Sequence, residues 1–160
     1  MASETRFGLA EPGDVSTLSG LEFLKAMIDG RLPAPAMAGT LGFRLVDVAD
    51  GKAVFEGEPW PGLLNPLGIV HGGWALTLID SATGCAVHTT LPAGIGYTTV
   101  ETKVNFSRPI APGGGIVRCE GRVVTRGRRI ATAEARLLDA KGKILAHGSS
   151  TLMILEPKTG

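Results

Sequence analysis

The chain has 160 residues, of which 44% are hydrophobic and 19% charged, with a formal net charge of +1. This length and composition fit one globular domain with a sizeable core. The charge balance, without a long block of like charge, argues against a broad nucleic-acid surface, so we expect the partner to be a small molecule or a second copy of the chain.

The first residues are polar and hold no basic stretch followed by an apolar run. No secretory signal is therefore visible, and we expect a cytoplasmic protein. Residues 1 to about 15 are predicted to be a loose arm, after which Ser16 or Ser19 caps a short helix. We assign 1–35 to this arm and helix and 36–157 to the main domain. The helix is expected to pack outside the domain, and the alternative role is a lid over a substrate tunnel.

Two strands are predicted next, because apolar residues alternate with small or polar ones from Thr40 onward. Asp50-Gly51 forms the tight turn between these strands. The following stretch, rich in proline and glycine, is a loop that brings the chain through Asn65 to the next helix.

A long helix from Gly72 to about Thr89 has almost no polar side, which is typical of a helix inside a core. Asp80 lies in the middle of it. A carboxylate among apolar neighbours is unfavourable unless it is hydrogen-bonded, paired or protonated. Asp80 is thus a candidate for chemistry, with a bond to Thr77 or Thr83, or a place at a chain interface, as the alternatives.

The helix begins with His71-Gly72-Gly73, so its first N–H groups can be approached closely. Such a terminus suits an anion or a polarised carbonyl oxygen. Gly72 and Asp80 are separated by about 12 Å of helical rise, too far for one small reacting group to touch both. Two antiparallel copies of the helix would bring Gly72 of one near Asp80 of the other, which predicts a symmetric dimer.

The rest of the chain reads as antiparallel strands. From Tyr97 the sequence alternates, and this pattern predicts that Val100, Thr102, Val104 and Phe106 share the face toward the helix. Short turns then join further strands, which requires antiparallel neighbours. These strands are predicted over 115–125, 130–139 and 144–155. The predicted fold is α+β: an antiparallel sheet of five or six strands around one long helix.

The cysteines and the remaining histidines are given structural roles. Cys85 and Cys119 lie on different elements without a Cys-x-x-Cys spacing and read as reduced packing residues. His88 and His147 show no metal-ligand spacing, so no metal is expected. The long helix is too polar for a membrane span.

The order of these elements, the His71-Gly72-Gly73 entry, the position of Asp80 and the Ser107-Arg108-Pro109 strand end resemble the hotdog-fold thioesterases of the phenylacetate-degradation (PaaI) type. The resemblance covers about Ala36 to Leu155. It implies an acyl-coenzyme A (CoA) thioesterase that works as a dimer, commonly paired into a tetramer. It implies no cofactor, since CoA is part of the substrate.

The resemblance also assigns roles. It implies that the Gly72 N–H binds the thioester carbonyl, and that Asp80 of the other subunit activates water or attacks directly. Asn65 matches the family's asparagine, and Thr99 its strand hydroxyl, with Thr98 as the other alignment. His71 is expected to hydrogen-bond the loop that sets Gly72, and direct proton transfer is its alternative.

This chemistry suits a site that is poor in acids. An N–H at a helix terminus stabilises the developing oxyanion, and a thiolate leaves without a strong general acid. Arg126, Arg128 and Arg129 at one turn could bind CoA phosphates, or simply keep a sheet edge soluble.

Two other functions compete with hydrolysis. One is a hydratase or dehydratase acting on acyl thioesters. Such enzymes have an Asp followed five residues later by a His, or a His followed by a buried Glu on the helix, and this sequence has neither pattern. The other is a non-catalytic module that binds or senses an acyl-CoA. The acyl group, aromatic or medium-chain, stays open.

Overall fold

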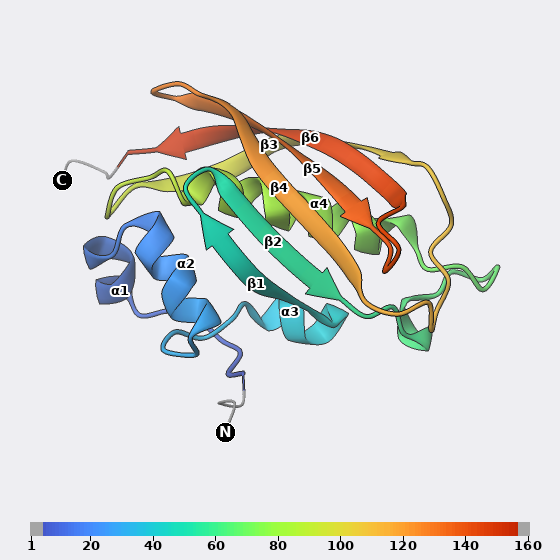
Figure 1. Cartoon of the computed structure of the whole chain (residues 1–160). Helices are drawn as coiled ribbons and strands as arrows, with labels where there is room; N and C mark the ends of the chain where they lie inside the picture. Colours follow the sequence, from blue (N-terminus) through green and yellow to red (C-terminus); the bar gives the residue numbers. More distant parts are fainter. Residues whose placement is uncertain (1–4, 157–160) are drawn as a thin grey trace.

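The computed structural model describes residues 5–156 (Figure 1). Its elements follow one another as α1 (Pro12–Thr17), α2 (Gly20–Ile28), α3 (Ala36–Leu41), β1 (Phe43–Ala49), β2 (Lys52–Gly57), the 3-10 turn η1 (Pro61–Leu63), α4 (Gly72–His88), β3 (Gly96–Phe106), β4 (Val117–Arg126), β5 (Ile130–Leu138) and β6 (Ile144–Leu155). Within this range no helix is both long and apolar enough to cross a bilayer.

The described strands form one six-stranded antiparallel sheet in the order β1-β2-β4-β5-β6-β3. The sheet curves around α4, which runs along its concave side (Figure 1). This confirms the predicted α+β architecture of a long helix wrapped by an antiparallel sheet. The predicted start of the helix at Gly72 is also confirmed.

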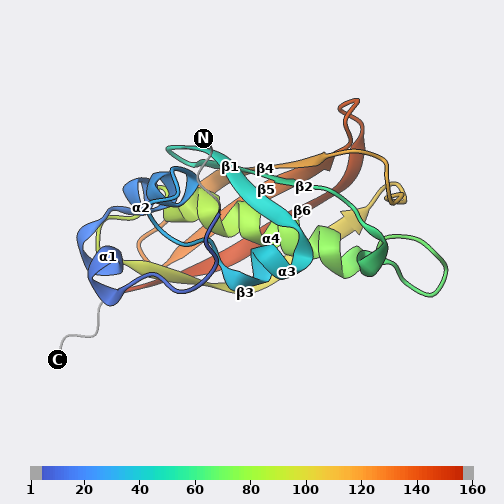
Figure 2. The ribbon, with the colours of Figure 1, turned by 90° about the horizontal axis from the view of Figure 1, so that it is seen from below.

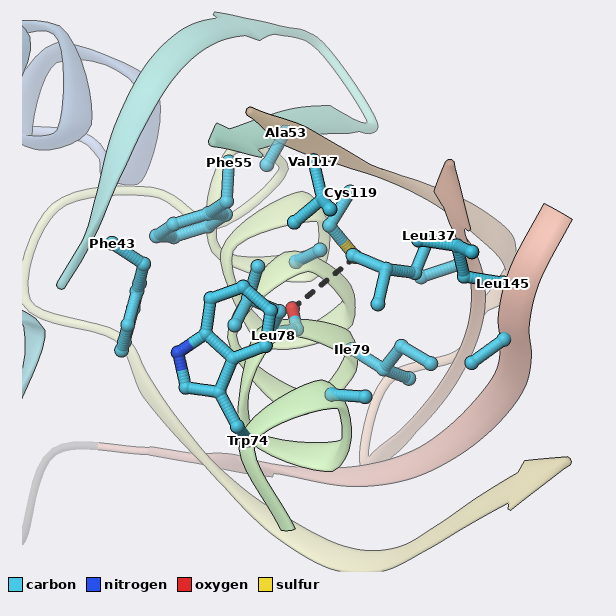
Figure 3. Packing of buried hydrophobic residues seen from close by; sticks show 14 of the residues in the cluster. Phe43, Ala53, Phe55, Trp74, Leu78, Ile79, Val117, Cys119, Leu137 and Leu145 are labelled. Carbon is cyan, nitrogen blue, oxygen red and sulfur yellow. Dashed lines mark hydrogen bonds between the residues drawn. The ribbon is translucent and has the colours of Figure 1, made fainter. Parts of the chain in front are cut away.

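The core lies between α4 and the sheet (Figure 3). Trp74, Leu78 and Ile79 of α4 are buried against side chains from β1, β2, β4, β5 and β6. The helix backbone comes very close to β4, because a Cβ at Gly121 would overlap the carbonyl of Ala82. A glycine in a strand permits such an approach, and here it sets how deeply α4 sits in the sheet.

One side of α4 is left open by the sheet, contrary to the expectation of a helix buried all round. Leu76 is 39% exposed, and Thr77, Asp80 and Ser81 are half-buried. A curved sheet covers a helix from one side, so the other side needs a different cover. Figure 2, the view from below, shows α4 from this open side, with α2 near its C-terminal end.

The N-terminal segment is more ordered than the predicted loose arm. Residues 1–4 of that arm lie outside the described residues, but 12–17 form α1, and α3 was not expected at all. The predicted cap of α2 is confirmed at Ser19, which exchanges hydrogen bonds with Glu22 in a capping box. Leu24 of α2 is buried in the same core as α4, so this helix belongs to the body of the domain.

A β-bulge in β3 corrects the predicted alternation. The register with β6 shifts between Thr99 and Glu101, so one extra residue, Val100, lies in β3. Val100 is 61% exposed instead of facing the helix, and Phe106 is 58% exposed. Because the bulge reverses the sides of the strand, Thr99 and Thr102 both face α4, although their positions differ by an odd number, three.

Candidate active site

Asp80 lies on the open side of α4 and is tied to the edge strand. Its Oδ1 accepts a hydrogen bond from Thr102 Oγ1 at 2.8 Å. The alternative partners are engaged elsewhere, since the hydroxyls of Thr77 and Thr83 contact backbone carbonyls of α4. The carboxylate therefore has a defined orientation that is set by a residue from outside its own helix.

Asp80 opens onto a cavity of about 410 Å³ between α4, β1, β3 and the N-terminal segment. Thr99 lines this cavity with Asp80, whereas Thr98 is exposed and outside its lining. The geometry thus favours Thr99 over Thr98 as the hydroxyl beside the carboxylate. Three further polar residues, Thr5, Arg44 and Ser81, also line the cavity. The rest of the wall is mostly apolar and is formed by Met27, Ile28, Ala34, Pro35, Met37, Phe43, Leu45, Val46, Phe55, Cys85 and Tyr97.

Two titratable groups of the cavity wall, Cys85 and Tyr97, and the neighbouring His88 are held neutral. Burial raises the pKa of the Cys85 thiol to about 12, and burial also raises the pKa of Tyr97 well above its usual value. Burial lowers the pKa of His88, whose ring packs between Phe23 and Tyr97. At neutral pH these groups carry no charge, so the carboxylate of Asp80 is the reactive candidate on this wall.

His71 caps α4. Its Nδ1 accepts from the Gly73 N–H at 2.9 Å, and its carbonyl accepts from the Trp74 N–H at 2.9 Å. Among the described residues the N–H of Gly72 has no hydrogen-bond acceptor. The first turn therefore presents one free donor, at the glycine that the sequence singled out.

Gly72 faces a different hollow from Asp80. This second hollow, about 360 Å³, lies between the start of α4 and the strand end at Ser107-Arg108-Pro109. The ring of Phe106 lies so close that a Cβ at Gly72 would be 3.0 Å from it. Within one chain the structure thus keeps Gly72 and Asp80 apart, which agrees with the separation expected from their spacing on the helix.

Asn65 shapes the loop before α4. Its side-chain oxygen accepts from the backbone N–H groups of Leu67 and Ile69, at 3.0 and 3.2 Å. Both of these contacts use the oxygen, so the side-chain amide remains a donor. Asn65 therefore belongs with His71 and Gly72, at the end of α4 away from Asp80 in the same chain.

The three arginines predicted to bind CoA are exposed at the β4–β5 turn. Figure 1 shows this turn at the opposite end of the sheet from the loop that leads into α4. Two arginines earlier in β4 are instead paired with carboxylates, Arg118 with Glu56 and Glu120, and Arg122 with Glu134. Among the described residues, Arg126, Arg128 and Arg129 form no ion pair.

Two further observations concern metal binding and the location of the site. No group of three or more His, Cys, Asp or Glu side chains within 5–156 is arranged to hold a metal ion. The most spacious hollow among those described, about 910 Å³ beside Trp60 and β1, contains none of the predicted catalytic residues.

The structure adds residues that sequence reasoning missed. Thr102 was assigned to the helix-facing side of β3 but given no role, and Ser150 was not singled out. Both hydroxyls belong to the hydrogen-bonded group around Asp80, together with Thr83. The only signal in the sequence is a polar residue at a core-facing strand position, which does not identify a partner on another element.

Comparisons with known proteins agree on one family. The model of the thioesterase superfamily matches residues 67–146. Human acyl-coenzyme A thioesterase 13 is 30% identical over 137 residues, covering 84% of this chain and 94% of that protein.

Solved structures give the same result. A phenylacetic acid degradation-related protein from Ralstonia eutropha is 31% identical with a TM-score of 0.74, covering 81% of this chain and 98% of the other. A Streptococcus mutans protein bound to acetyl CoA is 22% identical with a TM-score of 0.66, covering 74% and 92% of the two chains, and this likeness concerns the fold alone.

Proposed function

This chain belongs to the thioesterase superfamily and is a thioester hydrolase, and from that membership we propose that it hydrolyses an acyl-CoA at a site shared by two copies of the chain. The observation that carries the proposal is the carboxylate of Asp80 in the wall of an apolar cavity, beside the hydroxyl of Thr99. An apolar cavity with a few convergent polar groups is typical of a site for a small organic ligand.

We place the acyl group in the cavity of about 410 Å³. Most of its wall is aliphatic, aromatic or thioether in character, which suits an aryl or medium-chain acyl group better than a polar one. Helix α2 supplies Met27 and Ile28 to this wall, which supports the lid-like role that was the alternative expectation for this helix.

The thioester carbonyl would be bound by the Gly72 N–H of the partner subunit. That donor is preorganised at a helix terminus and is free among the described residues, as an oxyanion site requires. Asn65 and His71 would support it by fixing the loop and the first turn of α4.

Hydrolysis then needs one proton acceptor. Asp80 takes a proton from a water held near Thr99, and the water oxygen attacks the carbonyl carbon. The resulting oxyanion is stabilised by the N–H of Gly72, and it collapses by breaking the carbon–sulfur bond. The CoA thiolate leaves and takes up the proton that Asp80 accepted from water, which regenerates the carboxylate, so that water and acyl-CoA give free acid and CoA. Direct attack by Asp80 through an anhydride is the alternative, and a single turnover in ¹⁸O-labelled water distinguishes it.

The edge of the sheet supports the two-chain site. Among the described strands β3 pairs only with β6, which leaves an eleven-residue edge that carries the exposed side chains of Val100 and Phe106. A long exposed edge is normally covered. Antiparallel pairing of two β3 strands about a two-fold axis would cover it and would bring in a second α4 that runs in the opposite direction.

This pairing would also place arginines where they can bind the phosphates of CoA. It reverses the direction of the partner, so the partner's α4 N-terminus would lie toward the same end of the combined sheet as the β4–β5 turn (Figure 1). Arg126, Arg128 and Arg129 would then be available for the phosphates. A pair of such dimers remains a further expectation.

The test measures thiol release from phenylacetyl-, hydroxybenzoyl-, short-chain and medium-chain acyl-CoAs. We expect turnover by the wild type and a loss of about 10²-fold or more in Asp80→Asn, with acyl-CoA binding retained. The matched control is Asp47→Asn, the same change at an exposed position of β1, which should leave turnover unchanged.

Other outcomes would contradict the proposal in different ways. Binding without thiol release from any thioester would identify a sensing module instead of an enzyme. Full activity of Asp80→Asn would keep the enzyme but refute the site.

A further inference from the structure

Three hydroxyl groups, on β3, β6 and α4, form a chain of hydrogen bonds that starts at Asp80. Thr102 Oγ1 lies 2.8 Å from Asp80 Oδ1 and 3.0 Å from Ser150 Oγ. Ser150 Oγ lies 2.7 Å from Thr83 Oγ1. Thr83 and Ser150 are 0% and 2% exposed, so water does not compete for the contact between them.

The fold brings these four side chains together from three elements. Asp80 and Thr83 are three residues apart on α4 and therefore lie on one face of the helix. Thr102 of β3 and Ser150 of β6 are directly paired across the two strands and face that helix. The bulge at Val100 gives Thr102 this direction while Thr99 still lines the cavity.

Counting protons gives the chain of hydroxyls a direction. An ionised carboxylate can only accept, so the single proton of Thr102 goes to Asp80. Thr102 then accepts from Ser150, and Ser150 accepts from Thr83. In this arrangement the proton of Thr83 points to Ser150, at 2.7 Å, and not to the backbone carbonyls of Ile79 and Asp80, at 2.9 and 3.0 Å. This is the only arrangement in which each of the three oxygen–oxygen contacts contains a proton. Every hydroxyl dipole in it points toward Asp80.

The three hydroxyl groups contact only one of the two carboxylate oxygens of Asp80. Among residues 5–156, Asp80 Oδ1 accepts from Thr102, and Oδ2 has no hydrogen-bond partner. Thr102 is not part of the cavity wall, whereas Asp80 is. Thr102 therefore lies behind the carboxylate, on the side away from the proposed substrate.

We propose that Thr102, Ser150 and Thr83 form a positioning chain that holds Asp80 through Oδ1 and leaves Oδ2 to act on water. This inference rests on the proposed function and deepens it. None of the three residues touches substrate. They act by fixing the rotamer of the one group that does, and such fixing from behind is what keeps a catalytic group in productive geometry.

The chain also fits the protonated state of Asp80. The proton taken from water resides on Oδ2, so Oδ1 remains an acceptor and Thr102 still donates to it. No hydroxyl has to change its direction, so a carboxyl that gains and loses a proton in each turnover keeps its position.

The decisive variant is Thr102→Val, which removes the hydroxyl but nearly keeps the shape. We expect kcat for acyl-CoA hydrolysis to fall about 10- to 100-fold, as when a catalytic group is misplaced, with KM nearly unchanged. Thr102→Ser restores the hydroxyl and should recover most of kcat. A merely structural role would not produce this split between kcat and KM together with the rescue.

Thr132→Val is the matched control. Thr132 makes an equivalent hydroxyl–hydroxyl contact, 2.7 Å from Thr125, away from Asp80 on the same sheet. The Thr132→Val variant should leave kcat unchanged.

Ser150→Ala breaks the chain of hydroxyl groups one step further from Asp80 and should lower kcat by less than Thr102→Val. It also tests the proposal independently if Thr102→Val does not fold.

The outcomes separate this inference from the proposed function. Wild-type turnover that Asp80→Asn abolishes but that Thr102→Val and Ser150→Ala leave intact overturns the positioning chain alone. Equal losses in Thr102→Val and Thr102→Ser also overturn it, because the hydroxyl is then irrelevant. No turnover by the wild type overturns the proposed function itself, and the inference with it.

Discussion

Asp80 and Gly72 illustrate two ways in which a residue acquires reactivity from its setting. Asp80 is a half-buried carboxylate with one oxygen anchored and the other unpartnered among the described residues. Gly72 contributes only its backbone N–H, which is left over because a helix cannot satisfy its own first donors. The next N–H, that of Gly73, donates to the side chain of His71, so the N–H of Gly72 is the single free donor among the described residues of the first turn.

The proposed donor can be removed without breaking the helix. Gly72 is the first residue of α4, where proline is well tolerated, and His71 before it is extended, as a residue preceding proline should be. Gly72→Pro therefore deletes one N–H at a compatible site. We expect kcat/KM for acyl-CoA hydrolysis to fall about 10²-fold or more, measured by thiol release.

The control for this change is Gly72→Ala. Alanine keeps the N–H and adds the same Cβ near the ring of Phe106, so it separates the donor from the crowding. It should retain most of the activity. Similar losses in the two variants would show that crowding, and not the missing donor, is responsible.

At this scale the sequence indicates candidate residues better than how they are held. Gly72 and Asp80 could be singled out because their surroundings in the chain are unusual: two glycines at a helix start and one acid in an apolar helix. Asn65 was singled out only by the resemblance to the family. Thr102 could not be singled out, because its partner lies 22 residues away on another element. Its direction also depends on a bulge that no glycine or proline marks.

The elements themselves were largely predictable, for a physical reason. The apolar run of α4 and the alternation in β1 to β6 reflect burial against each other, so pattern and structure have the same cause. The bulge in β3 and the short helix α3 arise from tertiary packing instead, and their sequences carry little local signal. The open side of α4 was missed because apolar residues there, such as Leu76, are the same types that fill a core.

Helix α2 has a functional consequence if the cavity holds the acyl group, because it closes that cavity through Met27. Met27→Ala should lengthen the space and shift the preference toward longer acyl chains. Each additional methylene that becomes buried is worth about 0.8 kcal/mol, or about fourfold in kcat/KM. A series of straight-chain acyl-CoAs of increasing length measures this shift.

Met153→Ala provides the comparison for this prediction. Met153 lies on β6, is 37% exposed and is not part of the cavity wall, so its truncation should leave the chain-length profile as in the wild type. If Met27→Ala also leaves the profile unchanged, the acyl group lies elsewhere and α2 serves packing alone.

For the whole molecule, the separation of Gly72 and Asp80 on one helix is the fact that needs a second copy. Their hollows are distinct within one chain, and the open side of α4 and the edge of β3 both lack a cover among the described residues. A two-fold pairing would bring Gly72 of each copy near Asp80 of the other, and it would cover the open side of α4 and the edge of β3 in both copies.

Mixing two inactive variants tests this arrangement directly. In a heterodimer of Asp80→Asn with Gly72→Pro, a site built from both chains would collect the two lesions in one place and leave the other site intact. Random exchange of equal amounts gives about half heterodimers, each with one working site of two, so activity should return to about one quarter of the wild-type value. If both residues acted within one chain, every site would keep a lesion and mixing would restore nothing. Measuring thiol release before and after subunit exchange, with mass determination in solution to confirm the dimer, therefore decides whether the active site belongs to one chain or to two.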